Sequence, residues 1–320
     1  MRNIKYYGRK EEGIMQNQIL EHYLKTGTYT YAGPYGDYFR SLPDAVDQIG
    51  HLVCAQVIHR VTLREGNTNA NHKLQYGDMT KFPWHRMRCE DDILMTAVAM
   101  TAELFRLDER GFVPDRRTED KIVVTCRYVS VLMSAILKAK KIPCRSRSGF
   151  APYFQPGKSM DHWINQYWNK KEERWITFDA DGFYDESGMN LGQYDIAEGK
   201  FDYAARAWLD VRRKNVNGSR FIYADGLGTC SLKAIIRALF YDFHSLMNDE
   251  ISYRFQPCYV DEKFERLTER DFAELDMLAE LMLEPDKNFE ELTRIWDTEK
   301  KYRIMNSPLV GDSDNLGRWE

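Results

Sequence analysis

The stretch Thr125-Cys-Arg-Tyr-Val-Ser-Val-Leu-Met-Ser-Ala-Ile-Leu-Lys-Ala-Lys140 decides the fold. Its apolar side chains recur at the spacing of one helix face, and they are Val129, Leu132, Met133, Ile136 and Leu137. Cys126 lies three residues before Val129 and therefore shares that face. The pattern predicts a helix over residues 125–140 that carries a cysteine on its buried side, close to its start.

The position of Cys126 suits a nucleophile. Thr125 is a candidate N-cap, so the first turn would present free N–H groups and the positive end of the helix dipole to the sulfur, which favours the thiolate. A single cysteine on a core helix is nevertheless more often a small buried apolar residue. A nucleophilic thiol also needs a base beside it and a group that orients that base.

Three strands are predicted after this helix. Residues 145–150 follow it directly, and residues 161–168 and 175–179 are rich in the aromatic and β-branched side chains that strands favour. The charged run Asn169–Arg174 between the last two predicts a solvated turn. The predicted core is thus a helix followed by an antiparallel sheet.

The last two strands bring a histidine and an aspartate together. If the hairpin is centred between Lys170 and Lys171, His162 faces Asp179 directly, close enough for the carboxylate to accept the imidazole N–H. Asp181 is the alternative carboxylate. Each residue alone has an ordinary explanation, His162 as a structural histidine and Asp179 as a turn residue. With Cys126 they form a coherent nucleophile, base and orienting group.

These segments carry a family resemblance. Residues 125–150, Asp161-His-Trp163 and Trp175-Ile-Thr-Phe-Asp179 resemble the transglutaminase-like superfamily, and especially its bacterial members of unassigned substrate. The resemblance implies a papain-like α+β core with helical elaborations at both ends, in which Cys126 is the nucleophile, His162 the base and Asp179 its orienting carboxylate. Weaker matches outside the core carry no known role, and they are Tyr29–Gly33, Ser41–Asp44, Arg86–Arg88 and Ala205–Arg212.

The chain departs from the family pattern at four positions. Thr125 and Lys141 stand where glycines usually precede the nucleophile and end its helix. Ile164 and Gln166 stand where an aromatic residue and a glutamate are common. All three triad positions are kept, so the resemblance still implies catalysis.

The oxyanion hole is only half assigned by the sequence. The backbone N–H of Cys126 is the natural first donor, because negative charge develops next to the attacked carbon. Trp84 and Tyr76 lie upstream and are candidates for the second donor, although each is more readily explained as a packing residue.

Composition excludes several function classes. The net charge of −4 gives no overall attraction to nucleic acid. We expect no membrane span and no secretory signal, and hence a cytoplasmic location, because no sufficiently long apolar run occurs. The basic stretch from Lys138 to Arg147 is explained by a solvated helix end and the outer face of a strand, more readily than by an anionic substrate.

The cysteines favour neither a disulfide framework nor a metal knuckle. Six are widely scattered without a CxxC pair, and they are Cys54, Cys89, Cys126, Cys144, Cys230 and Cys258. A zinc site of Cys126, Cys144, His162 and Asp179 is chemically acceptable. Cys144 begins a strand, however, and its packing there is the simpler explanation. We therefore expect free thiols, and neither a metal nor another cofactor.

The chain divides into three predicted regions: a helical N-terminal region over 1–113, the catalytic core over 114–200 and a helical C-terminal region over 201–320. The predicted flanking helices are Glu11–Lys25, Pro43–Leu63, Glu90–Leu107, Ser231–Ile251, Glu269–Leu283 and Phe289–Trp296. Thr268 and Asp271 resemble a capping box. Wide apolar stripes predict that these helices pack on the core or on one another. A polar loop is predicted over 65–72, and a tail without fixed structure over 306–320.

Three functions fit these features. The first is a transglutaminase-like cysteine enzyme that acts on an amide or peptide bond through a thioester, with hydrolysis favoured over deamidation or crosslinking because water is always available. Its substrate would be a peptide, a protein or a small amide. The second is a catalytically idle module that uses the same cleft to bind peptides or proteins. The third is an assembly protein whose helical flanks bind a partner.

Overall fold

The computed structural model describes residues 13, 15–60, 82–86, 90–181, 191–224, 227–253, 255–260 and 263–303. Residues 15–24 are helical. The other helices (α), 3-10 helices (η) and strands (β) of the described residues are η1 (Gly33–Tyr35), α2 (Gly36–Ser41), α3 (Val46–Cys54), β1 (Val57–His59), η3 (Trp84–Arg86), α6 (Ala97–Leu107), η4 (Thr118–Asp120), β2 (Ile122–Val124), α7 (Cys126–Ala139), β3 (Cys144–Ala151), β4 (Ser159–Asn169), β5 (Arg174–Phe178), β6 (Asp202–Tyr203), α8 (Ala204–Arg212), η5 (Gly218–Arg220), β7 (Phe221–Ile222), α9 (Leu232–Leu246), η6 (Phe264–Arg266), α10 (Glu269–Leu283), α11 (Phe289–Thr298) and η7 (Lys300–Tyr302).

A curled sheet forms the centre of the molecule. Its strands lie in the order β5-β4-β3-β6, and β7 pairs with the start of β4. All pairs along this path are antiparallel, and only the β4–β7 pair is parallel. The mixture of helices with a mainly antiparallel sheet agrees with the predicted α+β class.

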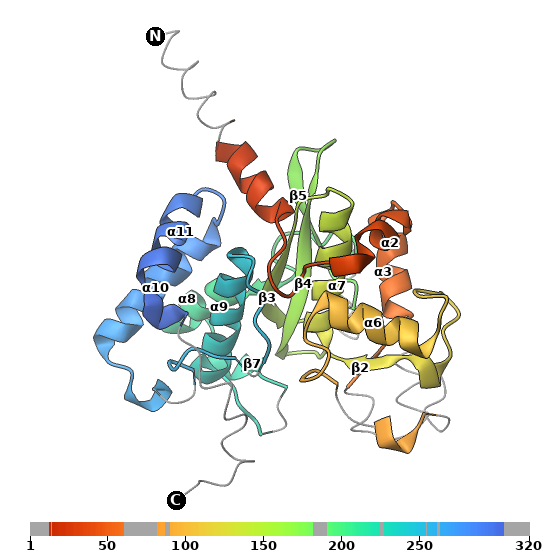
Figure 1. Cartoon of the computed structure of the whole chain (residues 1–320). Coiled ribbons are helices and arrows are strands. Elements are labelled where there is room, and N and C mark those ends of the chain that lie inside the picture. The colour runs from red at the N-terminus through yellow and green to blue at the C-terminus, as the bar shows by residue number, and fades with distance from the viewer. Residues whose placement is uncertain are drawn as a thin grey trace, which may run out of the picture.

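Helices cover the sheet on two sides (Figure 1). On one side α7 packs against β3 and β4, and α2, α3 and α6 pack around α7. On the other side α8 and α9 pack against β3, while α10 packs on α8 and α11 on α10. The helical flanks therefore lie on the core or on one another, as their apolar stripes predict.

Helix α7 matches its prediction to within one residue at each end. It ends in a Schellman motif, in which Ile142 N–H donates to Leu137 O at 2.9 Å and Lys141 N–H to Lys138 O at 3.0 Å. Lys141 adopts the left-handed conformation with φ of 64°, where a glycine is usual. The helix end expected from the sequence thus forms with a lysine in the strained position.

The prediction for the second helix was wrong beyond Cys54. The helix predicted over Pro43–Leu63 ends there, and Val57–His59 forms β1, which pairs in parallel with β2 at Ile122–Val124. Val57 continues the spacing of the helical stripe, so periodicity alone could not separate the two structures. Similarly, the helix predicted from Glu90 begins only at Ala97.

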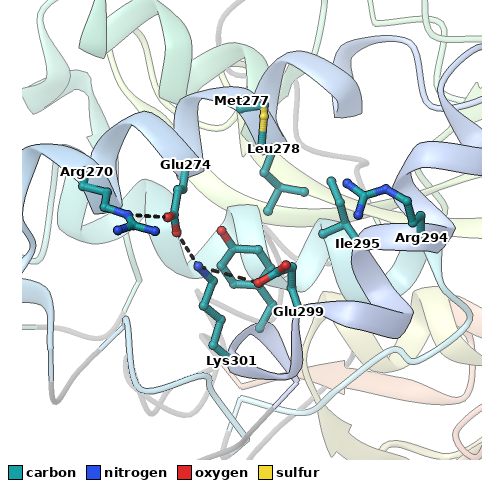
Figure 2. Close-up of a pocket in the computed structure, with 9 residues that line it drawn as sticks. Arg270, Glu274, Met277, Leu278, Arg294, Ile295, Glu299 and Lys301 are labelled. Atoms are coloured by element: carbon teal, nitrogen blue, oxygen red, sulfur yellow. Dashed lines mark hydrogen bonds and ion pairs between the residues drawn. The ribbon is translucent and has the colours of Figure 1, made fainter.

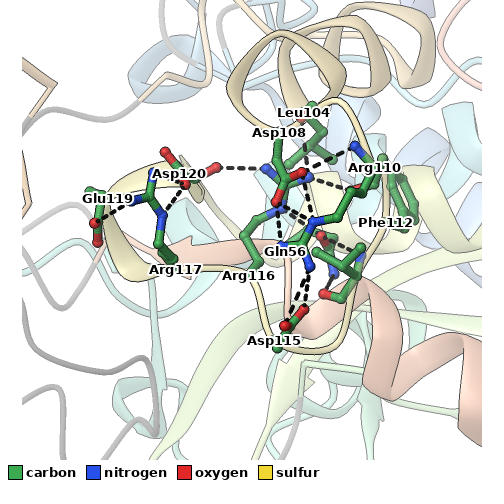
Figure 3. Close-up of polar contacts among 12 residues, drawn as sticks. Gln56, Leu104, Asp108, Arg110, Phe112, Asp115, Arg116, Arg117, Glu119 and Asp120 are labelled. Atoms are coloured by element: carbon green, nitrogen blue, oxygen red, sulfur yellow. Dashed lines mark hydrogen bonds and ion pairs between the residues drawn. The ribbon is translucent and has the colours of Figure 1, made fainter.

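A buried polar cluster fixes this parallel pair (Figure 3). Gln56 Oε1 accepts a hydrogen bond from Arg116 Nε at 2.6 Å, and Gln56 Nε2 donates to Val113 O at 2.7 Å. The same Arg116 guanidinium donates to the backbone oxygens of Leu104, Gly111 and Asp120. Because Gln56 precedes β1 and Arg116 precedes β2, this cluster holds in place the strand that leads directly into Cys126.

The explanation of the basic stretch as a solvated surface was wrong for three of its residues. Lys138, Arg145 and Arg147 are all buried, and each has an acidic partner. The pairs are Lys138 with Glu250, Arg145 with Asp286 and Arg147 with Asp242. A single sequence could not show these partners, because they come from the C-terminal region that folds over β3.

Removing the Asp242 charge is expected to destabilise the protein strongly. Asp242 of α9 accepts Arg147 Nε at 2.8 Å and Nη2 at 2.9 Å, and it also accepts the Ser148 N–H at 3.0 Å. Asp242→Ala should lower the free energy of unfolding by about 3–5 kcal/mol, because it leaves a buried guanidinium without its partner. Denaturant unfolding measures this loss. Glu280→Gln, which removes an exposed ion pair with Arg213, is the control and should cost less than about 1 kcal/mol; equal losses would contradict the expectation.

Helices α10 and α11 form within two residues of their predicted bounds, whereas α9 ends at Leu246 and not at the predicted Ile251. The capping box is present, with Thr268 Oγ1 accepting the Asp271 N–H at 3.3 Å and Asp271 accepting the Thr268 N–H at 2.8 Å. The predicted loop over 65–72 and the tail over 306–320 lie outside the described residues. Within the described part of the chain, no helix has the length and apolar character needed to cross a membrane.

Candidate active site

His162 and Asp179 form the hydrogen bond that the sequence predicts. His162 Nε2 lies 2.8 Å from Asp179 Oδ2, and both side chains are buried, with 2% and 1% of the side-chain area exposed. A carboxylate only accepts hydrogen bonds, so Nε2 carries the proton of this bond. The other ring nitrogen, Nδ1, is left to exchange a proton with a reacting group.

The strand register that joins these residues differs from the prediction. β4 and β5 pair Gln166 with Thr177 and Trp168 with Trp175, so the hairpin is shifted by two residues and Asp179 does not face His162 directly. A shift of two keeps every side chain on its predicted face, because side chains alternate with a period of two. His162 therefore reaches Asp179 diagonally, just beyond the end of β5.

Cys126 lies beside the imidazole. The pKa of His162 is raised well above its ordinary value of 6.5. Burial alone would lower this pKa, but the charges of Asp179 and Cys126 and the hydrogen bonds to them outweigh burial. Cys126 is the first residue of α7, so its backbone N–H has no acceptor within the helix. Thr125 occupies the N-cap position as predicted, but its side chain does not cap the helix; it lies 3.4 Å from Asp91 Oδ2.

A glycine allows close packing behind the histidine. Gly149 of β3 is the cross-strand partner of His162. A Cβ atom placed on Gly149 would lie 2.3 Å from Asp202 O and 2.8 Å from the Phe201 ring, which is closer than real contacts allow. The strand opposite His162 thus requires glycine for β6 to pack against it.

Asp179 is held by more than His162. Tyr153 OH donates to the same oxygen, Oδ2, at 2.6 Å, and the backbone N–H of Asp181 donates to Oδ1 at 3.1 Å. The N–H of Asp179 itself donates to Gln193 O at 2.9 Å. Sequence reasoning missed Tyr153, because it lies in the turn between β3 and β4, where no periodic pattern relates a side chain to the site.

Tyr253 is a second residue that sequence reasoning missed. Its hydroxyl lies 3.6 Å from Cys126 Sγ. Burial, followed by the charge of Cys126, raises the pKa of Tyr253 well above 10, so the hydroxyl keeps its proton and can donate to the sulfur. Its segment shows no periodic pattern that would have identified it.

The two candidates for the second oxyanion donor are not supported. Trp84 is 84% exposed and its ring lies against His85, so it is not buried beside the thiol. Tyr76 lies outside the described residues. The Cys126 N–H therefore remains the one donor that we assign.

Asp181, the alternative carboxylate, lies near the candidate triad, but the carboxylate that bonds His162 is Asp179. Burial raises the pKa of Asp181 to about 7, with the nearby Asp179 charge adding to this effect and His162 opposing it. His59 Nε2 lies 4.0 Å from Asp181 Oδ2, but burial lowers the pKa of His59 to about 3. The two groups are therefore largely neutral at pH 6 and do not form an ion pair there.

Nothing in the described part of the chain forms a metal centre. No group of three or more histidine, cysteine or acidic side chains there is arranged to hold an ion. Cys144, the fourth residue of the zinc alternative, packs at the base of β3, with its sulfur 3.6 Å from Ser134 Oγ and 3.9 Å from Asn165 Nδ2. Burial raises the pKa of Cys144 to about 11, which suits a packing thiol.

A cavity of about 220 Å³ lies elsewhere, on α10, α11 and η7 (Figure 2). Each cationic side chain of its rim has an acidic partner: Arg270 contacts Glu274, Lys301 contacts both Glu274 and Glu299, and Arg294 contacts Glu291, which lies outside the lining. None of its lining residues belongs to the group around Cys126. The cavity therefore offers no unpaired cation to a ligand and no link to the thiol.

The arrangement contains what acyl transfer through a thiol requires. Cys126 can attack, His162 can accept and return its proton, and Asp179 can orient the imidazole. No family model matches this chain, and neither a curated protein nor a solved structure does.

Proposed function

We propose that this protein is a cysteine-dependent amide hydrolase or acyl transferase. The observation that carries the proposal is the 2.8 Å hydrogen bond between His162 Nε2 and Asp179 Oδ2, formed on a histidine whose pKa the neighbouring Cys126 also raises. A helix, a strand and the residue that follows the next strand supply the nucleophile, the base and the orienting group that thiol catalysis needs.

The reaction would follow the general thiol mechanism. His162 accepts the Cys126 proton, the sulfur attacks the amide carbonyl, and the oxyanion forms near the Cys126 N–H. Collapse of this intermediate breaks the C–N bond, and His162 returns the proton to the leaving amine, which leaves a thioester on Cys126. Water then attacks the thioester, with His162 again accepting a proton, and releases the acid and the free thiol.

The resemblance to the transglutaminase-like superfamily supports the same proposal and extends it to a papain-like core. We favour hydrolysis, since transfer to an amine needs an acceptor channel that excludes water, whereas water is always present. The acyl donor would be a peptide, a protein glutamine or a small amide. Every step uses side chains of this chain and water, and none needs a cofactor.

A catalytically idle binding module is the second candidate, and one observation favours it. Only 5% of Cys126 is exposed, and Tyr253 OH lies against its sulfur. A substrate could reach the sulfur only after Tyr253 moved. If that movement does not occur, the fold would serve for recognition alone.

The rate of Cys126 alkylation distinguishes the two candidates. In the wild-type protein Cys126 should react with iodoacetamide at neutral pH, because the adjacent His162 can accept the thiol proton. His162→Ala removes that base and should slow the reaction at the same pH. Peptide mass spectrometry measures the rate at each cysteine, and Cys144 serves as an internal control that should stay unreactive. A Cys126 rate that is unaffected by His162→Ala would contradict the proposed function.

A further inference from the structure

The side chain of Tyr153 makes a buried hydrogen bond to the candidate site. The residue follows β3 at the start of the turn into β4 and is fully buried. Its hydroxyl lies 2.6 Å from Asp179 Oδ2, the oxygen that also accepts His162 Nε2 at 2.8 Å. The tyrosine must be the donor, because the carboxylate can only accept.

This bond restricts the rotation of the Asp179 carboxylate. Oδ2 accepts from both His162 and Tyr153, whereas Oδ1 accepts the Asp181 N–H at 3.1 Å. Three donors therefore hold the carboxylate, two of them on Oδ2. Without the tyrosine hydroxyl, His162 would be the only described donor on Oδ2, and this oxygen would be held less firmly at the imidazole.

The same turn also restrains the histidine ring. Phe154 meets His162 edge to face, with ring centroids 4.7 Å apart and planes at 80°. Tyr153 lies at 90° to the imidazole with centroids 6.4 Å apart. The turn after β3 therefore contacts both members of the pair, the ring through Phe154 and the carboxylate through Tyr153.

The hydroxyl keeps its proton in this environment. Burial, followed by the charge of Asp179 and the hydrogen bond to it, raises the pKa of Tyr153 well above 10. Tyr153 therefore remains a donor at neutral pH.

We propose that Tyr153 is a positioning residue, whose hydroxyl fixes the Asp179 carboxylate in the orientation that holds His162 Nε2. The inference rests on the proposed function for its catalytic meaning, but the orientation itself can be measured without a substrate. It adds a fourth residue to the candidate triad, one that acts through Asp179 and does not touch the reacting atoms.

The test is the exchange of the His162 Nε2–H proton with water, measured by NMR of the full chain with ¹⁵N-labelled histidine and assigned with His162→Gln. Tyr153→Phe should speed this exchange roughly tenfold or more, the factor that matches the loss of a hydrogen bond to a charged group. Tyr128→Phe is the matched control, because Tyr128 is equally buried and donates to Asp91 O at 2.7 Å. It should leave the exchange unchanged.

The possible results test the role of Tyr153 separately from the proposed function. Unchanged exchange in Tyr153→Phe, or equal acceleration in Tyr128→Phe, would overturn the role of Tyr153. If Tyr153→Phe does not fold, the wild-type chain decides: a slowly exchanging tyrosine hydroxyl proton with a cross-peak to the His162 ring supports the role, and its absence overturns it. Cys126 alkylation on the same samples tests the proposed function separately, since a rate insensitive to His162→Ala contradicts that function whatever the NMR result.

Discussion

Replacing Cys126 with alanine is expected to abolish covalent turnover of any amide substrate. Removing the nucleophile of a catalytic triad lowers kcat on the order of 10⁶-fold in well-studied enzymes. Cys126→Ser should lose nearly as much, because a site arranged for a thiol ionises a hydroxyl poorly. The measurement is a screen of peptide and small amide substrates against the wild-type protein and both variants.

A stability measurement is the control for this loss. Only the sulfur is removed or replaced, and the one hydrogen bond described for it is with Tyr253 OH at 3.6 Å. The melting temperatures of both variants should therefore stay close to that of the wild type. Turnover at the wild-type rate in Cys126→Ala would show that the assignment is wrong and that Cys126 is a core residue.

Asp179→Asn is expected to lower kcat/KM by roughly 10²–10⁴-fold, the range typical of disrupted acid–base catalysis. The reason lies in the donors that surround this side chain. His162 and Tyr153 donate to Oδ2, and the Asp181 N–H donates to Oδ1. An amide has only one oxygen, so its NH₂ group must face a donor on one side. Either His162 takes the wrong tautomer, or the bond at Asp181 is lost.

Asp181→Asn is the matched control for this variant. Burial raises the pKa of Asp181 to about 7, so below pH 7 its carboxyl is mostly neutral and resembles an amide in shape and charge. Its replacement should change kcat/KM only a few-fold at pH 6. Steady-state kinetics of the two variants at that pH make the comparison. A larger loss in Asp181→Asn than in Asp179→Asn would reverse the roles of the two carboxylates.

The sequence was sufficient where local patterns decide the structure. The apolar spacing of α7 and the β-branched and aromatic runs of β4 and β5 gave their ends to within two residues. His162 and Asp179 came together even though the hairpin register was wrong by two residues, since an even shift preserves the face of each side chain. The sheet face on which His162 and Asp179 meet was therefore predictable, but the residue that each strand position pairs with was not.

The sequence was insufficient where distant segments decide the structure. Val57–His59 continues a helical stripe and becomes a strand only because Ile122–Val124 pairs with it. Arg147 is buried because Asp242 arrives from a helix that begins about 85 residues later. Tyr153 and Tyr253 lie in irregular segments, where no periodicity relates a side chain to the site.

The most direct test of the central claim, that Cys126 is a nucleophile activated by His162, is acylation by p-nitrophenyl acetate. The wild-type protein should release a burst of one nitrophenolate per chain, and mass spectrometry of the acid-quenched protein should find one acetyl group on the peptide that contains Cys126. His162→Ala should give no burst. A burst of equal size in Cys126→Ala, or acetylation confined to other residues, would contradict the account.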